Sequence, residues 1–328
     1  MSKRRVLSGI RATGRLHLGN YLGAVKGMVE LEESDKYETL YMVADLHSLT
    51  TPYDKEKLQE NVKNVVLDYL SAGINPEKST IFIQSQVPEH TELFYLFSTV
   101  VSLARMMHLP TYKEKIAQHP KSSTVALLNY PVLMASDILI YKAGLVPVGI
   151  DQEPHLEIAR EIARKMNATY GLDFLEPKRF ATKGEYVPSL TGEGKMSKSV
   201  DGSFINLTDD LEAIKKKLSK VPTDSGAGDM LPKEGGVATL FTLIELFQGT
   251  NERIKYEEQY IGSGIKYSEL KEKLSEAIYE DLKPIQEKRS ELESDPEYVD
   301  KVIKEGAEKA RKIASETLKE VKQKMGLG

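Results

Sequence analysis

Short apolar runs alternate with longer helical patterns over the first 150 residues of the chain. The runs at residues 6–10, 39–44, 80–83 and 145–148 are bounded by polar or turn residues and have the length of strands. Between the second and third runs, apolar residues recur every three or four positions, which predicts a helix, and residues 157–166 predict another. Strands that alternate with helices in this way predict a parallel α/β sheet.

The pattern changes after about residue 203, where the strand signals fade and the chain becomes helical and rich in charge. Its closing segment places apolar residues from 299 to 321 on one stripe, which predicts an amphipathic helix with a solvated charged face. Residues 188–204 are rich in Gly, Ser, Thr and Lys and predict a mobile loop. Residues 93–109 are apolar on nearly every side, so the helix expected there is either buried core or a subunit contact.

Composition narrows the class of protein. The 328 residues carry a formal charge of −4, so an RNA partner requires a local basic surface rather than a basic protein. With no Cys there is no disulfide, no thiolate zinc site and no Cys-held iron–sulfur cluster. We find neither a membrane span nor a signal peptide, and we expect a cytoplasmic protein.

The first candidate motif follows the first predicted strand, where residues 17–20 read His-Leu-Gly-Asn. A glycine-bearing loop lets a nucleotide approach the backbone, and the start of a helix offers unpaired N–H groups to phosphate. His17 and Asn20 add polar side chains at that point. Taken alone, a local hydrogen-bonding role for His17 remains the alternative.

The second candidate motif lies in the predicted loop, where residues 195–199 read Lys-Met-Ser-Lys-Ser. Two lysines three positions apart can both reach a polyphosphate, and the serines add hydroxyl donors. A solvated basic loop is the alternative. A chance match of this pentapeptide in such a chain has odds on the order of one in ten thousand, so its occurrence downstream of the first motif favours function.

In this order, the two motifs resemble the HIGH and KMSKS motifs of class I aminoacyl-tRNA synthetases, with Asn in the fourth place of the first. Residues 130–139, 146–155, 284–287 and 305–310 are similar to those of the bacterial tryptophanyl type, and the likeness runs from residue 6 to the end. The resemblance implies a Rossmann-like catalytic domain followed by an all-helical anticodon-binding domain. The expected ranges are a catalytic domain with a helical insertion at the dimer contact (1–190), the KMSKS loop (191–203), the tRNA-binding helices (204–295) and a C-terminal helix packed back on the body (296–328).

The resemblance also assigns residues to ATP. Those expected to touch it are Arg11, Ala12, Thr13, Gly19, Asn20, Gly149, Ile150, Asp151, Val187, Lys195, Met196, Ser197, Lys198 and Ser199. The catalytic residues among and beside them are His17, Asn20, Lys195, Lys198 and Lys115, the last of which could equally be a surface lysine. Ala12 replaces a proline that is usual in the family, and Arg11 stands where bacterial relatives often have Gln.

Recognition of tryptophan requires apolar walls and one acceptor for the indole N–H, best a carboxylate. Met134 and Asp137 are three apart in a helical context and share a face, so Asp137 is the expected acceptor. The resemblance adds residues for the ring and the α-amino group, giving the set Leu7, Val43, His47, Tyr130, Met134, Asp137 and Gln152. A structural histidine is the alternative for His47.

The implied activity is that of a tryptophan–tRNA ligase, which forms tryptophanyl-adenylate from L-tryptophan and ATP and passes it to tRNA(Trp). Mg²⁺ is expected on the ATP phosphates, with no protein metal site, and a homodimer is implied. Tyrosyl-tRNA synthetase is the alternative within the class. A smaller nucleotidyltransferase would lack the second motif, and a binding-only relative would not keep both motifs chemically competent.

Overall fold

The computed structural model of the chain describes residues 3–110, 112–113, 116, 124–181, 186–198 and 200–327. It divides the chain into two compact units. Unit 1 contains residues 1–14, 27–181 and 295–328, and unit 2 contains residues 15–26 and 182–294. Both motifs therefore belong to unit 2, whereas the strand that leads into the first motif belongs to unit 1.

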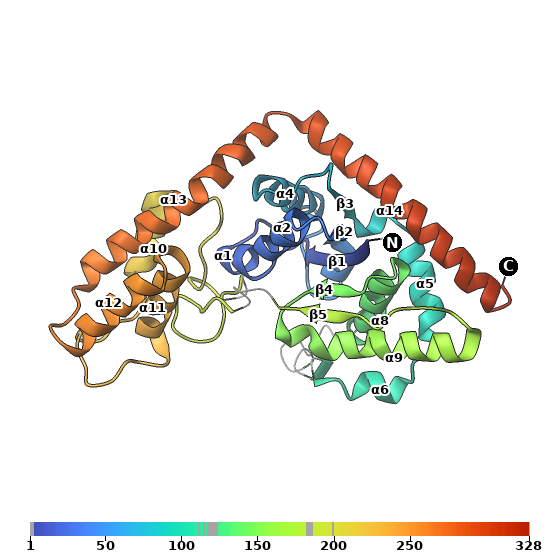
Figure 1. Ribbon diagram of the computed structural model, residues 1–328, viewed down its shortest axis with the longest axis horizontal. Coiled ribbons are helices and arrows are strands. Elements are labelled where there is room, and N and C mark those ends of the chain that lie inside the picture. Colours follow the sequence, from blue (N-terminus) through green and yellow to red (C-terminus); the bar gives the residue numbers. More distant parts are fainter. Residues whose placement is uncertain are drawn as a thin grey trace. The chain divides into compact units, whose positions relative to one another are not determined.

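Unit 1 is built around a parallel sheet of five strands in the order β3-β2-β1-β4-β5 (Figure 1). The strands are β1 (Arg4–Arg11), β2 (Tyr37–Ala44), β3 (Ser79–Ile83), β4 (Leu145–Pro147) and β5 (Lys178–Phe180). The four strands predicted from the sequence are confirmed, and β5 is an edge strand that its short polar-rich sequence did not reveal. The second half of β2 is buried on both faces, as expected for a central strand of a parallel sheet.

Helices connect and cover these strands. They are α2 (Lys26–Glu33), α3 (Asp45–Ser48), α4 (Leu58–Ser71), α5 (Glu89–Ser98), α6 (Leu103–Met107), α8 (Val125–Ile140) and α9 (Glu153–Tyr170), with short 3₁₀ turns η2 (Gln84–Gln86) and η4 (Ile150–Gln152). The single helix expected over residues 93–109 was wrong. The chain leaves α5 after Ser98, and Ser102 caps α6 by accepting a hydrogen bond from the backbone N–H of Arg105.

The closing helix α14 (Pro296–Lys324) runs along β3 and α5 of unit 1 (Figure 1). It begins at Pro296, after Asp295 accepts a hydrogen bond from the N–H of Tyr298. Its close approach to the sheet depends on Gly306, where an added Cβ would lie 1.7 Å from the carbonyl oxygen of Ile81. A side chain of any size at this position would push the helix away from β3.

Unit 2 is helical. It contains α1 (Leu18–Asn20), a π-helical turn η1 (Tyr21–Val25), α10 (Leu211–Ser219), α11 (Gly235–Gln248), α12 (Thr250–Ile261) and α13 (Tyr267–Glu293). The long α13 packs on both α10 and α11 through a buried apolar face. In the part of the chain that the structure describes, no helix combines the length and apolar character needed to cross a membrane.

Candidate active site

The sheet of unit 1 has a topological switch point between β1 and β4. The chain moves from β1 outward to β2 and β3, and then returns to the other side of β1 with β4. In open parallel sheets, ligands bind outside the carboxyl ends of the strands at such a point. Of the expected ATP residues, Arg11 ends β1, Ala12 and Thr13 follow it, and residues 149–151 come after β4, so the fold brings these two groups to the same edge of the sheet.

Backbone hydrogen bonds join the two motif regions in unit 2. The N–H of Leu18 donates to the carbonyl of Ile205 at 2.8 Å, and the N–H of Leu207 donates to the carbonyl of Leu16 at 3.1 Å. His17 therefore lies opposite Asn206 in an isolated antiparallel bridge. The first motif is thus paired with the segment that follows the second motif in the sequence.

Gly19 is the point at which the two motifs touch. An added Cβ there would lie 3.0 Å from both Cε1 and Nδ1 of His17 and 3.2 Å from Cβ of Met196. His17 and Met196 are both buried, and Met196 is also held by its N–H, which donates to the carbonyl of Val187 at 2.9 Å. The glycine of the first motif is therefore required for contact with the second, in addition to any approach by a nucleotide.

His17 is buried in a positively charged environment, which suits the binding of a negatively charged ligand. Burial, together with the positive charges of Lys198 and Lys195, lowers the pKa of His17 to about 4, so the imidazole is neutral at pH 7. Among the described residues, its buried Nδ1 has no hydrogen-bond partner. Its backbone is fixed by Asn20, whose side-chain Oδ1 accepts from the N–H of His17 at 3.3 Å. A buried polar atom without a partner is costly, which is consistent with a ligand contact at this position.

The second motif is held by its own loop. Ser203 Oγ accepts from the N–H of Ser197 at 3.2 Å and donates to its carbonyl, and Lys195 forms an antiparallel bridge with Pro188. Lys195 is exposed and Lys198 is partly exposed. Lys115 and Ser199, expected at the phosphates, lie outside the described residues.

Asp137 lies in α8 of unit 1 and is 2% exposed. It accepts hydrogen bonds from His47 Nε2 at 2.7 Å and from His90 Nδ1 at 2.6 Å. Gln84 donates to both of its oxygens, at 2.8 and 3.0 Å. Burial alone would raise the pKa of Asp137, but the hydrogen bonds from the two histidines outweigh it and lower the pKa to about 2. The carboxylate is therefore ionised and can act only as an acceptor.

The expected apolar walls lie in the same unit. Leu7 in β1 and Val43 in β2 are buried in the sheet, whereas Met134 is half-buried on the same helix as Asp137. His47 follows β2 directly, and its ring meets that of Tyr130 edge-on with centroids 6.3 Å apart. Leu7 and Met134 belong to the core cluster that includes α8, whereas Val43 alternates with Met42 and Ala44 of that cluster and therefore faces the other side of the sheet.

His155 connects the two residues expected at the α-amino group. Its Nδ1 lies 2.9 Å from Oε1 of Gln152, and its Nε2 lies 2.8 Å from the hydroxyl of Tyr130. Because an amide oxygen only accepts, Nδ1 carries a proton, and when the ring is neutral its Nε2 accepts the hydroxyl proton of Tyr130. The oxygen of Tyr130 thus presents lone pairs, which suits an ammonium group.

Sequence reasoning missed four residues of this cluster, namely Gln84, His90, Tyr141 and His155. A signal existed for Gln84, because a polar residue directly after a buried strand lies at the edge where parallel sheets bind ligands. His90 and Tyr141 stand in ordinary helical sequence and gave no such signal.

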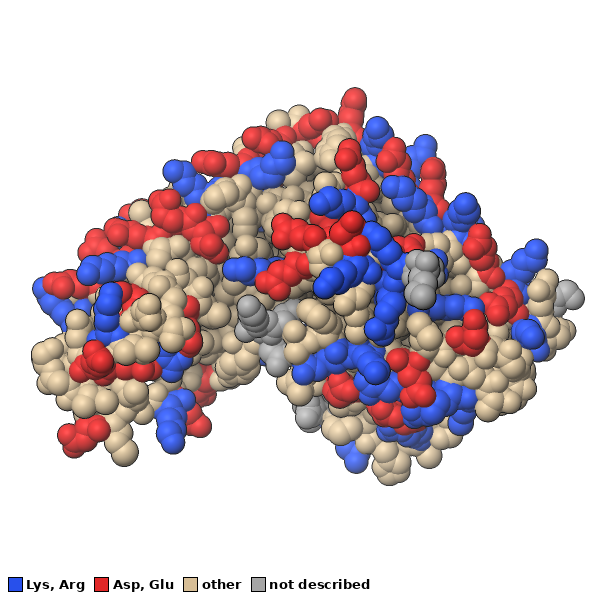
Figure 2. All heavy atoms as spheres, in the orientation of Figure 1, with Lys and Arg blue, Asp and Glu red and all other residues tan. Residues whose placement is uncertain are grey.

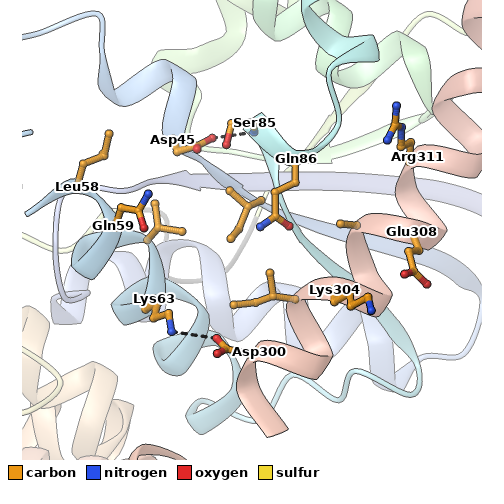
Figure 3. A pocket seen from close by; sticks show the side chains of 14 residues that line it. Asp45, Leu58, Gln59, Lys63, Ser85, Gln86, Asp300, Lys304, Glu308 and Arg311 are labelled. Carbon is orange, nitrogen blue, oxygen red and sulfur yellow. Dashed lines mark hydrogen bonds and ion pairs between the residues drawn. The ribbon is translucent and has the colours of Figure 1, made fainter. Parts of the chain in front are cut away.

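A cavity of about 560 Å³ lies elsewhere in unit 1, between α4, η2 and α14 (Figure 3). None of the predicted site residues lines it. Its wall includes Asp45 and Ser85, which are joined by a hydrogen bond from the N–H of Ser85 to Oδ1 of Asp45 at 3.0 Å (Figure 3). The cavity is therefore distinct from the residues grouped around Asp137, although the two share the backbone that follows β2 and β3.

Charged side chains along α14 do not form a basic stripe. Basic and acidic residues alternate along this helix (Figure 2). Several of them pair within unit 1, as in the contacts of Lys322 with Glu92 at 2.7 Å and of Arg311 with Glu89 at 3.0 Å. These two ion pairs join α14 to α5.

Comparison with known proteins agrees with this geometry. The family model described as tRNA synthetases class I (W and Y) matches residues 1–283. The tryptophan–tRNA ligase of Fusobacterium nucleatum is 42% identical over 328 residues, covering 99% of this chain and 98% of the relative. Among solved structures, the tryptophanyl-tRNA synthetase of Mycoplasma pneumoniae matches with a TM-score of 0.87 at 31% identity, covering 100% and 99% of the two chains. That of Campylobacter jejuni, complexed with ADP and tryptophan, matches with a TM-score of 0.85 at 35% identity, covering 98% and 100%.

The chain belongs to the class I aminoacyl-tRNA synthetases of the tryptophan and tyrosine group. It is an ATP-dependent aminoacyl-tRNA ligase with a Rossmann-like fold. Within that group it is of the bacterial tryptophan–tRNA ligase type, and the tyrosyl alternative has less support because these full-length relatives are tryptophan enzymes.

Proposed function

We propose that the chain binds L-tryptophan and ATP at the residues described above and charges tRNA(Trp) in two steps. In the first step, a carboxylate oxygen of tryptophan attacks the α-phosphorus of ATP, and the bond to the β-phosphate breaks to release pyrophosphate. In the second step, a hydroxyl of the 3′-terminal adenosine attacks the carbonyl carbon of the adenylate, and AMP leaves. No covalent enzyme intermediate is required, so catalysis consists of positioning and stabilisation of charge.

The observation that carries the adenylate chemistry is the contact of the two motifs at Gly19. It places the imidazole of His17 beside the loop that bears Lys195 and Lys198. A neutral imidazole and two ammonium groups can stabilise the charge that develops on the phosphates without forming a covalent bond. The other residues proposed to contact ATP or its phosphates are Arg11, Ala12, Thr13, Gly19, Asn20, Gly149, Ile150, Asp151, Val187, Met196 and Ser197. Lys115 and Ser199, which lie outside the described residues, are also part of the proposal.

Mg²⁺ enters this proposal as a companion of ATP. Among the described residues, no three His, Asp or Glu side chains are grouped to hold a metal ion. The proposed ion would be bound mainly through phosphate oxygens and water, as is usual for Mg²⁺. Bound there, the ion neutralises phosphate charge, and the protein side chains orient the phosphates.

Tryptophan recognition is assigned to unit 1. Asp137 accepts the indole N–H, and Met134, Leu7 and His47 lie around the ring; Val43, also expected there from the sequence, is on the opposite face of the sheet. Tyr130 and Gln152 receive the α-amino group, supported by their shared contact with His155. A site built on one specific hydrogen bond rejects an analogue that lacks it by about four to five orders of magnitude, which makes a separate editing domain unnecessary.

The proposal also includes a homodimer, a helical tRNA-binding region and a cytoplasmic location. Tyr95, Leu103 and Met107 on α5 and α6 are 70%, 64% and 51% exposed, which is unusual for large apolar side chains and supports a subunit contact there. Sedimentation of the purified chain tests this directly, since a monomer at micromolar concentration would contradict the dimer. The domain ranges expected from the sequence stay part of this proposal.

The experiment that tests the activity is ATP–pyrophosphate exchange with each of the twenty amino acids. Exchange is expected with tryptophan and not with tyrosine. Exchange with tyrosine would overturn the assigned specificity, and exchange with none would leave a binding protein without adenylate chemistry.

A further inference from the structure

We propose that Gln84 and His90 are positioning residues that hold the Asp137 carboxylate as a rigid acceptor. We further propose that the indole N–H of tryptophan takes the place of His47 on this carboxylate. Both statements rest on the proposed function, in which Asp137 binds the indole nitrogen.

The hydrogen-bonding capacity of Asp137 is the starting point. A carboxylate offers about four lone-pair directions. Three donor groups reach it: His90 on Oδ1, His47 on Oδ2, and Gln84, whose single Nε2 lies within hydrogen-bond distance of both oxygens. All three donor positions around the carboxylate are thus occupied by protein groups, and an indole N–H that binds at one of these positions must displace the donor there.

Gln84 cannot easily withdraw. Its side chain is fully buried, and its Oε1 accepts from the backbone N–H of Leu46 at 3.1 Å, which turns its amide N–H groups toward Asp137. The adjacent backbone is fixed as well, since Asp45 Oδ1 accepts from the N–H groups of both Leu46 and Ser85 at 3.0 Å (Figure 3). The amide of Gln84 thus bridges the turns that follow β2 and β3.

His90 is fixed at both ring nitrogens. Because Asp137 is ionised, the contact at Nδ1 must be an N–H donation from the histidine. The other nitrogen, Nε2, lies 2.7 Å from the hydroxyl of Tyr141. The ring is fully buried and packs against both Phe82 and Tyr141, with centroid distances of 6.0 and 5.4 Å. Both ring nitrogens of His90 therefore have a hydrogen-bond partner, which fixes the orientation of the ring.

His47 differs from both. It is 9% exposed, the most accessible of the three donors, and it lies on the four-residue helix α3 rather than in a long packed element. Its contact at 2.7 Å occupies Oδ2, the oxygen that Gln84 holds by the longer of its two bonds. Of the three donors, His47 is therefore the one that an indole N–H can replace.

This arrangement explains why a tryptophan pocket would contain more polar groups than the amino acid needs. Two permanent donors keep the carboxylate charged and fix its plane, so its acceptor direction is set before the substrate arrives. Pre-organisation of this kind increases the selectivity that one hydrogen bond provides, because binding free energy is not used to orient the acceptor.

The test compares L-tryptophan with 3-(benzothiophen-3-yl)-L-alanine, in which sulfur replaces the indole N–H at nearly the same size. The quantity measured is the ratio of kcat/KM for the two amino acids in ATP–pyrophosphate exchange. Loss of folded enzyme lowers both kcat/KM values equally, so the ratio reports on recognition even if a variant is partly unfolded.

His90→Leu removes the Nδ1 donor, whereas His90→Asn places an amide N–H at nearly the same point. The loss of a hydrogen bond to a charged group corresponds to about 10- to 100-fold, so His90→Leu is expected to lower the ratio by that factor. His90→Asn is expected to keep the ratio within about threefold of the wild type. A His90→Leu enzyme that keeps the full ratio would show that His90 only fills the core, and the proposal would fail.

His47→Ala tests the second statement. It is expected to change kcat/KM for both amino acids in parallel and to preserve the ratio within about threefold. A ratio that collapses in His47→Ala would make His47 a permanent orienting donor and contradict the exchange. If the wild type itself fails to activate tryptophan, the proposed function falls, whereas failure of the His90 or His47 arm alone leaves that function intact.

Discussion

The groups proposed to recognise tryptophan and those proposed to act on ATP are built in opposite ways. Asp137 in unit 1 is buried and has donors on both oxygens, all within hydrogen-bond distance. His17 in unit 2 is also buried, yet its Nδ1 has no partner among the described residues. For a group that selects a substrate, the protein can supply the orienting hydrogen bonds before the substrate binds. A group that stabilises charge during the reaction must keep a hydrogen-bonding position open for the reacting phosphates.

The largest effect is expected from the recognition side. Asp137→Ala removes the proposed acceptor and leaves its donors buried and unpaired, so kcat/KM for tryptophan should fall by about 10³-fold. The KM for ATP should change little, and exchange kinetics with each substrate varied in turn measure both. Asp300→Ala, an exposed aspartate of the same unit paired with Lys63, is the matched control and should keep both values. An equal rise in KM for tryptophan and for ATP would mean that Asp137 supports the folded structure rather than recognising tryptophan.

The scaffold beneath the recognition side depends on Gly306. In Gly306→Ala the new methyl group would meet the carbonyl of Ile81 in β3, the strand that leads into Gln84, and overpacking there should lower the free energy of unfolding by about 3 kcal/mol. Urea unfolding measures this, with exposed Lys309→Ala on the same helix expected within about 0.5 kcal/mol of the wild type. An unchanged midpoint would show that α14 is free to shift away from the sheet.

On the reactive side, Lys195→Ala should slow tryptophan-dependent exchange by about 10²-fold, because one charge-stabilising group is lost. Tryptophan binding without ATP, measured by equilibrium dialysis, should remain nearly unchanged. The exposed Lys233 of unit 2 provides a control variant with no expected effect on exchange. Weak tryptophan binding with a normal exchange rate would instead assign Lys195 to tryptophan recognition.

The smallest effect concerns the protonation of His17. Its pKa is about 4 in the folded protein, below the usual 6.5, so the unfolded chain binds a proton in this range that the folded protein does not. The contribution of His17 to stability is therefore complete above pH 6.5 and is lost as the pH falls toward 4. His17→Asn should reduce the pH dependence of the unfolding free energy in that window by up to about 1.4 kcal/mol per pH unit. Identical slopes for the variant and the wild type would mean that His17 is solvated as in a free chain.

The sequence predicted the parts of the molecule that follow local rules. Strand runs, the stripe of α14 and the two motifs are visible because periodicity and short spacings encode them. The helix expected over residues 93–109 failed because overall apolarity does not reveal a break, and the turn at residues 99–102 depends on a cap at Ser102. His47 was expected beside Asp137 and Gln84 had a positional signal, but His90 stands in ordinary helical sequence and could not be foreseen. The hydrogen bonds of all three to Asp137 join separate segments that only the folded sheet brings together.

The pairing of residues 16–18 with residues 205–207 has a consequence for how the protein is made. On a ribosome that adds about 5–20 residues per second, the first motif emerges roughly 10–40 s before the segment that completes its hydrogen bonds. During that interval the nascent chain holds half of the proposed nucleotide site without its other half. An enzyme that supplies translation thus remains unable to close on ATP until most of its own translation is finished.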